Sequence, residues 1–590
     1  MLDVYRKIYS LCGGDRGRFV FLIVAALFLA IFEMAAIALI APFLSLLMRP
    51  DMLEKNQYLH KAYLFSGIND ADQFMIGLGI VVLVFYIFTN VYIIVVNNSI
   101  MRFSLNQGYK ISTKLFTAYL SRDYIFFTNH NTAELSRVIF QDVARLTDNV
   151  LTPFLMLVSR SASVIAILVL LVVVDPIVTG VAAFLFGGCY ILFFMLNRKA
   201  LIDIGQRFSY YNNLRFRLVS EAFGGIKDCK IYGAEHYFVE KYRDSSYLDA
   251  INQAKRRMLL FIPRYVIETL AIGSLIIFSI FTYIQGKSDG LIATLLVFSL
   301  AAYKIMPAIQ IIYTNVGQIK SDKRALDLVL QDIALAEQGV VTQRFEVGDF
   351  TFKDILKIKN LSFSYPTASQ PVFKNLNLEI EPNTIVGFAG RSGSGKSTLV
   401  DIILGLLDYQ QGEIIIDNRQ LTARNKSGWQ NKLGYVPQSI HLLDASLAEN
   451  IAFGISKEQI DYQRVRKALV AAQLEELVDH ELADGVETFV GERGARLSGG
   501  QRQRIGIARA LYRQPEVLIL DEATSALDNL TEGLIVDSIC KLSGELTIIM
   551  IAHRLTTLRQ CDKIYVLEKG RITATGKYDE LMANNEYFQS

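Results

Sequence analysis

"TIVGFAGRSGSGKSTLVDIILGLL" (residues 384–407) begins as an apolar strand and ends as an apolar helix. The loop between them fits the pattern G-x-x-x-x-G-K-[ST], in which glycines permit the tight path that turns backbone N–H groups toward phosphate. Lys396 is expected to neutralise the β- and γ-phosphates, and Ser397 to hold Mg²⁺. The strand before the loop and the helix after it favour a nucleotide site over a simple glycine-rich turn.

A second half-site lies in "VLILDEATSALD" (residues 517–528). An apolar run typical of a buried strand delivers Asp521 and Glu522 at its carboxyl end, where α/β sheets place their ligands. Asp521 suits Mg²⁺ coordination, and Glu522 suits polarising an attacking water. Two solvated acids at a strand end would be the alternative if the upstream loop were absent. Together the two motifs predict a site for ATP and Mg²⁺.

"LSGGQRQRIGIARAL" (residues 497–511) resembles the signature motif of ABC ATPases. Tyr365 resembles the aromatic residue that stacks on adenine in that family, and Gln438 the glutamine of its Q-loop. Asp528 resembles the D-loop aspartate, and His553 the switch histidine. An ordinary strand aromatic and an ordinary structural histidine are the alternatives for Tyr365 and His553 taken singly. The order of all the motifs along the chain favours the family resemblance.

The resemblance implies a complete set of site residues. Those assigned to ATP are Tyr365, Gly390, Ser392, Gly393, Gly395, Lys396, Ser397, Thr398, Ser498, Gly499, Gly500, Gln501 and Asp528. Those assigned to Mg²⁺ are Ser397, Gln438 and Asp521, and those assigned to catalysis are Glu522, His553 and Gln438. In this family each ATP lies between the phosphate loop of one subunit and the signature of the other. A homodimer with two equivalent, hydrolysing sites is therefore expected.

The composition of the whole chain suggests a membrane part joined to a soluble part. Of 590 residues, 52% are apolar and 20% are charged, whereas soluble domains have about 25% charged residues. Runs of about 20 apolar residues can cross a bilayer; six such runs lie at 19–48, 74–98, 150–174, 176–196, 258–284 and 291–315. No cleavage site follows the basic N-terminal segment, so no removable signal peptide is expected. The five scattered cysteines predict neither a disulfide framework nor a zinc site.

Three domain segments follow from these patterns: a transmembrane domain at 1–316, a charged linker at 317–344 and an ATP-binding domain at 345–590. The resemblance to ABC exporter half-transporters covers both domains. The expected fold class is therefore an all-α six-span exporter domain followed by a soluble α/β P-loop ATPase domain.

The loops between the spans predict orientation. Lys and Arg are concentrated in 1–18, 99–149 and 197–257, which places these segments and the N-terminus in the cytoplasm. The two long inner connections are expected to be helical extensions that reverse near 131–139 and 209–217. By resemblance, these tips dock on the ATPases as coupling helices. The outer loop at 49–68 is either a short surface helix with an apolar stripe or an ordinary polar loop.

A charge in lipid costs a few kcal/mol or more, so charged residues inside the spans are candidates for contact with the transported substrate. The candidates are Glu33, Arg160, Arg264, Glu268 and Lys304. Pairing of Arg264 with Glu268, or of Glu33 with Arg160, is the structural alternative. At 1.5 Å per residue, Arg264 and Lys304 both fall about 10 Å from the inner membrane edge. A dimer would then present four cations to its cavity, which suits an anionic head group.

Short span segments add a narrower resemblance. "FEMAAIALIAPF" (32–43), "FIPRYVIETLAIG" (261–273) and "LAAYKIMPA" (300–308) are similar to bacterial flippases for polyprenyl-diphosphate-linked oligosaccharides used in protein glycosylation. The resemblance implies such a flippase in the bacterial inner membrane, with membrane lipids and an anionic lipid-linked substrate as partners and no nucleic acid. A general lipid or multidrug exporter and a membrane-tethered regulator that uses ATP without transport are the alternatives.

Overall fold

The computed structural model describes most of the chain. The residues outside the description are 1, 49–52, 54–56, 69, 175, 285–290, 339–349, 367, 369, 492–493, 523–532, 534–536, 540–543, 545, 553 and 590. The described residues form two compact units, one of Met1–Arg122 with Asn129–Val341 and one of Asp123–Thr128 with Thr342–Ser590.

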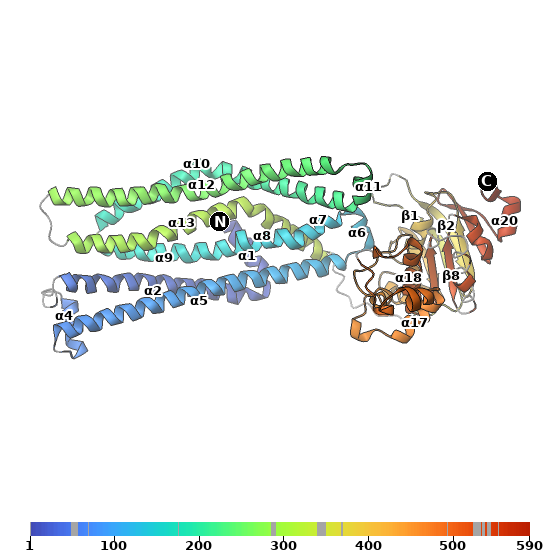
Figure 1. Ribbon diagram of the computed structural model, residues 1–590, viewed down its shortest axis with the longest axis horizontal. Helices are drawn as coiled ribbons and strands as arrows, with labels where there is room; N and C mark the ends of the chain where they lie inside the picture. The colour runs from blue at the N-terminus through green and yellow to red at the C-terminus, as the bar shows by residue number, and fades with distance from the viewer. Residues whose placement is uncertain are drawn as a thin grey trace. The chain divides into compact units, whose positions relative to one another are not determined.

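The first unit is helical (Figure 1). Its helices are α1 (Leu2–Leu11), α2 (Arg16–Met48), α4 (Gln57–Ser66), α5 (Ala71–Leu120), α7 (Thr132–Arg137), α8 (Val143–Leu146), α9 (Thr152–Val174), α10 (Pro176–Gly224), α11 (Ile226–Ile231), α12 (Glu235–Ile284) and α13 (Leu291–Gln338). Two π-helical turns, η2 (Val138–Asp142) and η3 (Thr147–Leu151), flank α8. Helices α2, α5, α9 and α13 pack together, and α10 packs along α12.

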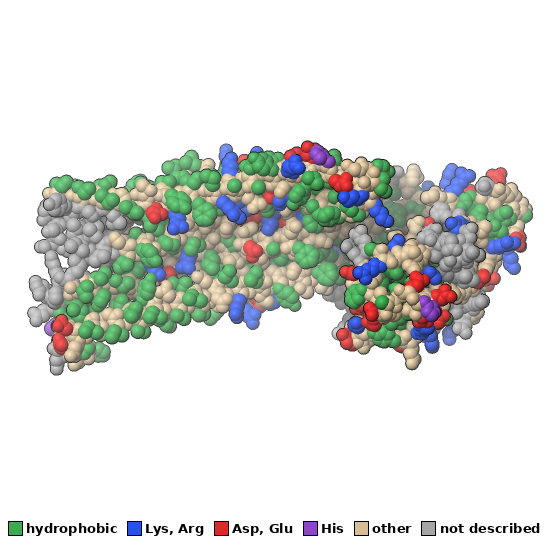
Figure 2. Space-filling view, viewed as in Figure 1, with side chains coloured by type: hydrophobic (Ala, Val, Ile, Leu, Met, Phe, Trp, Pro, Cys, Tyr) green, Lys and Arg blue, Asp and Glu red, His purple; other side chains and the backbone are tan. Residues whose placement is uncertain are grey.

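Four stretches of the described residues are long and apolar enough to cross a membrane: Gly13–Leu44, Ala71–Leu120, Thr132–Val174 and Thr179–Gly224. They overlap the first four predicted spans and contain the second and third of them completely. The fifth and sixth predicted spans are helical in α12 and α13, but several of their side chains lie outside the described set. Exposed apolar side chains cover much of the visible face of these helices (Figure 2), as a surface in contact with lipid requires.

Both predicted tips are misplaced along the sequence. The first reversal lies between α5 and α7 and contains α6 (Tyr124–Asn129), because the side chain of Asn131 accepts a hydrogen bond from the Ala133 N–H and starts α7 inside the predicted tip. In the second, α10 continues through 209–217, which has no glycine or proline. The chain reverses at Gly224–Gly225 and again at Gly233, whose φ is 61°.

The structure decides between the two alternatives for the outer loop and corrects the predicted linker. The outer loop is helical over Gln57–Ser66, and Tyr63 packs its ring edge-on against Phe74 at 5.2 Å. Most of the segment predicted as a linker, residues 317–338, is the end of α13. Its regular pattern of buried residues explains why it continues the helix.

The second unit contains two sheets. An antiparallel sheet has the order β2-β1-β4-β5, and a mostly parallel sheet has the order β10-β9-β3-β8-β7-β6. The strands are β1 (Leu356–Phe363), β2 (Phe373–Ile380), β3 (Ile385–Ala389), β4 (Gln411–Ile416), β5 (Arg419–Gln420), β6 (Leu433–Val436), β7 (Val517–Asp521), β8 (Thr547–Ile551), β9 (Lys563–Glu568) and β10 (Arg571–Gly576). The helices are α14 (Lys396–Ile403), α15 (Lys426–Gln430), α16 (Leu447–Ile451), α17 (Tyr462–Ala471), α18 (Gly499–Tyr512), α20 (Tyr578–Asn584) and α21 (Glu586–Gln589).

Alternate residues of the central strands enter two different cores. In β8, Ile548 and Met550 pack with α16–α18, whereas Ile549 and Ile551 pack with α14 and the antiparallel sheet. Strands buried on both faces form such continuous apolar runs. The parallel sheet is therefore fixed between two cores, with the carboxyl ends of β3 and β7 at one edge.

Trp429 anchors the second core below α14. Its side chain is fully buried, contacts the rings of Phe350 and Phe352 edge-on, and donates a hydrogen bond to the Ile403 carbonyl at 2.8 Å. We expect Trp429→Ala to lower the free energy of unfolding of this domain by about 3–5 kcal/mol, because it leaves a cavity and an unpaired carbonyl. Chemical denaturation of the full chain measures the change. Phe489→Ala, at an exposed ring, is the matched control and should have little effect; equal losses for both variants would contradict the prediction.

Candidate nucleotide site

The phosphate loop lies between β3 and α14, as predicted. Gly390, Gly393 and Gly395 have φ values of 148°, 79° and 106°, which favour glycine. A Cβ atom at Gly390 would lie 2.2 Å from the Leu567 carbonyl oxygen. The loop therefore requires glycine for backbone conformation and for close packing.

Two buried polar groups in this loop are suited to phosphate. The Lys396 ammonium donates to the carbonyls of Gly390 and Arg391 at 2.7 and 3.2 Å, and burial lowers its pKa. The Ser394 hydroxyl is buried and has no hydrogen-bond partner among the described residues. An ammonium held by carbonyls alone and an unpartnered hydroxyl fit an anionic ligand such as the phosphates of ATP.

The predicted acids stand at the end of β7. Asp521 is buried and receives a 3.5 Å contact from the Tyr435 hydroxyl of the neighbouring strand β6. Glu522 follows with φ 51°, and its carboxylate accepts a 2.6 Å hydrogen bond from the Gln438 amide. The structure thus brings together the predicted metal ligand, the predicted catalytic base and the Q-loop glutamine. If Mg²⁺ is bound, Asp521, Gln438 and Ser397 supply the oxygen ligands that it prefers.

Tyr435 and Asp401 were missed by the sequence interpretation. Asp401 is one helical turn beyond Ser397 on α14, and burial together with the Asp521 charge raises its pKa to about 6. Burial also raises the pKa of Tyr435, with smaller contributions from Asp521 and Asp401. The i, i+4 spacing from Ser397 was a signal for Asp401. Tyr435 had none, because its relation to Asp521 depends on strand pairing.

The other assigned residues lie on separate elements. The Tyr365 hydroxyl is 3.2 Å from that of Thr398, and its ring packs edge-on against Phe363. Ser498 caps α18: its hydroxyl accepts from the Gln501 N–H, and its own N–H donates to the Gln501 side chain. Gly499 and Gly500 form the first turn of α18, a helix N-terminus that suits an anion. Asp528 and His553 lie outside the described residues.

A segment from the first inner connection groups with the ATP-binding unit. Ile125 of α6 packs on the core that contains Trp429. Asp123 lies 3.4 Å from the Lys426 ammonium at the start of α15. The sequence predicted docking by this connection but placed the docking residues at 131–139.

The intramembrane charges divide into paired and unpaired groups. Glu33 is buried on α2 and lies 3.4 Å from Arg160 on α9, which is the structural alternative considered for this pair. Arg264 and Glu268 are exposed on α12 and form no ion pair with each other or with other described residues. Pairing within α12 therefore does not account for them.

Lys304 lies in a groove of about 410 Å³ between α2, α5 and α13. The lining is almost entirely apolar and includes Ile37, Phe43, Val82 and Tyr86. The ammonium is 5.2 Å from the centre of the Tyr86 ring, and no described carboxylate is within ion-pair distance of it. An apolar groove with one cation at membrane depth suits an anionic amphiphile.

Comparisons with known proteins agree along both units. A family model described as the ABC transporter transmembrane region matches residues 19–287, and one described as ABC transporter matches residues 373–525. The chain is 31% identical over 487 residues to the ATP-dependent lipid A-core flippase of Francisella novicida, covering 80% of each protein. It is 29% identical over 485 residues to the flippase of the same name from Cupriavidus pinatubonensis, covering 81% of this chain and 80% of that protein.

A solved structure described as a bacterial Atm1-family ABC exporter with ATP bound has a TM-score of 0.72 to this chain. The two share 20% sequence identity, and the match covers 98% of each. At this identity the likeness shows the fold.

Proposed function

The chain belongs to the ABC transporter family, as an exporter half-transporter, and on that premise we propose that it uses ATP to move an anionic lipid across a membrane. The predicted fold class, a helical exporter domain followed by an α/β ATPase domain, is confirmed. The chain is an ATP-hydrolysing translocase of the membrane, with several membrane-crossing helices. The relatives named as lipid A-core flippases favour a lipid over a soluble drug as cargo.

The observation that supports an anionic lipid most directly is Lys304 in its apolar groove. A lone ammonium in such a place has a high desolvation cost. An acidic lipid head group would offset that cost, and its chain would lie against the apolar wall. Arg264, exposed on the adjacent helix α12, is proposed as the second cation of the same cavity. Glu268 lies one turn further along α12 and is proposed to orient Arg264 or to balance its charge when the cavity is empty.

The working unit is proposed to be a homodimer in a bacterial inner membrane, with the N-terminus and the ATPase domain in the cytoplasm. Each chain carries one phosphate loop and one signature helix start, and each ATP is proposed to lie between the loop of one subunit and the α18 N-terminus of the other. The concentration of Lys and Arg in the inner segments supports this orientation.

The double variant Arg264→Ala/Lys304→Ala tests the cargo proposal. We expect at least a tenfold loss of transport of anionic lipid in proteoliposomes, with basal ATPase unchanged, because the ATP site lies in the other compact unit. Arg217→Ala/Glu221→Ala, at an exposed pair on α10, is the control. Retained transport would contradict the anionic-cavity proposal, and loss of both activities would indicate a structural role for the two cations.

Measuring which lipids stimulate the ATPase activity distinguishes between two narrower classes of cargo. A polyprenyl-diphosphate-linked oligosaccharide, the cargo that the span segments resemble, carries two phosphates that match two cations. A general lipid exporter instead responds to unrelated acidic amphiphiles. Stimulation by the diphosphate lipid alone would support the oligosaccharide, and stimulation by both would support the general exporter. Turnover without any transport would support the regulator alternative.

A further inference from the structure

Helix α13 holds the backbone of α12 at a proline inside that helix. Pro263 has no N–H group, so α12 itself cannot satisfy the Leu259 carbonyl in the usual way. The Tyr313 hydroxyl of α13 donates to this carbonyl at 3.2 Å. One residue further along α12, the Leu260 carbonyl accepts from the Gln310 amide of α13 at 2.9 Å. Two side chains of α13 therefore satisfy and fix the backbone of α12 at its proline.

A buried apolar cluster surrounds this junction and adds a third helix to it. Tyr190 and Leu201 of α10 pack with Leu260 and Ile267 of α12 and with Tyr313 of α13. Leu260 and Ile267 lie about two helical turns apart, on either side of the proline. Tyr190 therefore lies against the stretch of α12 that contains the proline.

Tyr190 also extends the hydrogen bonds of the junction. Its hydroxyl is buried and donates to the Gln310 side-chain oxygen at 3.3 Å. The Leu260 carbonyl can only accept, so Gln310 must present its N–H to that carbonyl and its oxygen to Tyr190. Tyr190 is then the donor, and its oxygen keeps only lone pairs for a further contact. We name Gln310 and Tyr190 the polar bridge.

The polar bridge ends beside Arg264. This arginine is exposed on α12, four residues after Leu260, and its charge interacts electrostatically with the Tyr190 hydroxyl. The hydroxyl oxygen is a neutral acceptor, so it attracts the guanidinium without cancelling its charge. The bridge thus begins at a carbonyl of α12 and ends at a cation of the same helix, which fixes the two relative to each other.

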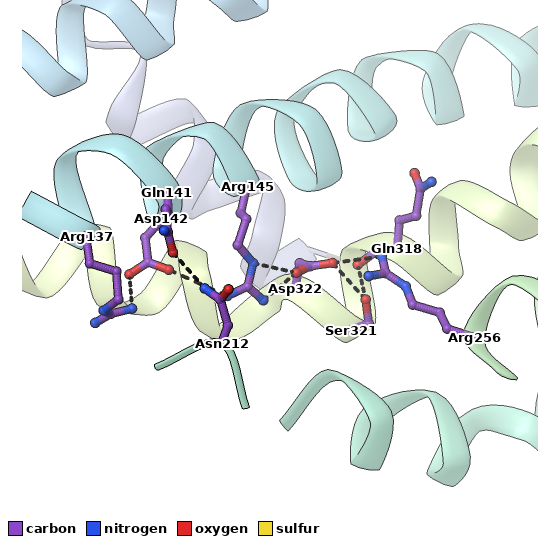
Figure 3. Close-up of polar contacts among 9 residues, drawn as sticks. All are labelled: Arg137, Gln141, Asp142, Arg145, Asn212, Arg256, Gln318, Ser321 and Asp322. Atoms are coloured by element: carbon purple, nitrogen blue, oxygen red, sulfur yellow. Dashed lines mark hydrogen bonds and ion pairs between the residues drawn. The ribbon is translucent and has the colours of Figure 1, made fainter. Parts of the chain in front are cut away.

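Other arginines of this unit have carboxylate partners instead. Arg145 and Arg256 both donate to Asp322 on α13, at 2.6 and 2.9 Å (Figure 3). A carboxylate shared in this way cancels charge that a ligand would otherwise meet. Among the described residues, no carboxylate forms an ion pair with Arg264. Its full charge is therefore available to a ligand.

We infer that Gln310 and Tyr190 are positioning residues for the acidic head group of the cargo, because they orient Arg264 and leave its charge unpaired. This inference rests on the proposed transport of an anionic lipid and adds two residues that act through Arg264. A carboxylate in place of the bridge would hold the guanidinium more strongly, but it would compete with the head group for the same cation.

Two tyrosines of the junction form a matched pair for the test. Tyr190→Phe and Tyr313→Phe each remove one hydroxyl that donates a hydrogen bond from a buried ring, but the described interaction with Arg264 belongs to Tyr190. Equilibrium binding of polyprenyl diphosphate without sugar is measured on the full chain in detergent. Tyr190→Phe should weaken this binding about fivefold, in the range of one net hydrogen bond, and Tyr313→Phe should change it by less than about twofold.

The Arg264→Ala background shows whether the bridge acts through the arginine. In that background Tyr190→Phe should weaken binding by less than about twofold, because no cation is left to orient. Gln310→Met keeps the length of the side chain and removes both of its hydrogen bonds to the junction. This variant should reproduce the loss seen for Tyr190→Phe, so the test does not depend on one substitution.

Three results would overturn the inference: binding by Tyr190→Phe within about twofold of the wild type, equal losses for the two tyrosine variants, or an effect of Tyr190→Phe that is the same with and without Arg264. Failure of the cargo proposal gives a different result, since Arg264→Ala itself would then leave binding unchanged. If Arg264→Ala weakens binding and Tyr190→Phe does not, the cargo proposal stands and the polar bridge alone is excluded.

Discussion

Glu522→Gln is expected to lower the turnover number for ATP at least about 100-fold while leaving ATP binding intact. A positioned general base contributes roughly 10²–10⁴-fold to a rate, and an amide cannot serve as that base. Glu522 is held for this role by its position after β7 and by the 2.6 Å hydrogen bond from Gln438. The introduced amide has the same shape and can still accept that hydrogen bond, so the site should keep its geometry.

Binding and hydrolysis are measured separately for this variant. Fluorescent nucleotide titration should give a Kd near that of the wild type, and phosphate release should give the reduced turnover number. Glu413→Gln, at an exposed carboxylate on β4 that lies 3.6 Å from Lys359, should leave both unchanged. Turnover within a few-fold of the wild type would assign the base to another group and would contradict the role of Glu522.

Most of the ATP site could be predicted from residues that lie close together in the sequence. The strand, loop and helix around Lys396 are contiguous in sequence, so the glycines and the apolar runs were enough to predict their arrangement. The same holds for the capping arrangement at Ser498, where Gln501 is three residues away. The contact of Tyr435 with Asp521 joins residues 86 apart through the pairing of β6 and β7, and no local pattern reports it.

In the membrane unit, too, contacts between residues far apart in the sequence could not be predicted. Hydropathy predicted the helices because a spanning helix must be apolar over its length. The reversals were misplaced because the helices extend far past the membrane, where their apolar faces still pack against one another. The hydrogen bond from Arg145 to Asp322 was not foreseen either: the two residues are 177 positions apart, and each alone resembles an ordinary solvated charge.

A second prediction tests whether each ATP site is shared between two subunits. Lys396→Ala removes the only ammonium that the described phosphate loop holds among its carbonyls, and Gly500→Asp places a carboxylate in the first turn of α18, opposite the expected γ-phosphate. An acidic residue in that turn does not destabilise the helix. Each variant alone should lose nearly all ATPase activity, since both sites of a homodimer would carry the same defect.

Coexpression of these two inactive chains should restore activity. In a mixed dimer, one site combines both defects, but the other pairs an intact phosphate loop with an intact signature helix. ATPase activity of mixed dimers, purified through two different tags, should therefore rise well above that of either parent. Dimers of Lys396→Ala with Lys396→Ala, carrying the same two tags, are the control, because neither of their sites has an intact loop. If the mixed dimers remain as inactive as this control, the shared site is excluded and each chain must build its ATP site alone. Restored activity would show that the α18 N-terminus, capped by Ser498, acts across the subunit boundary.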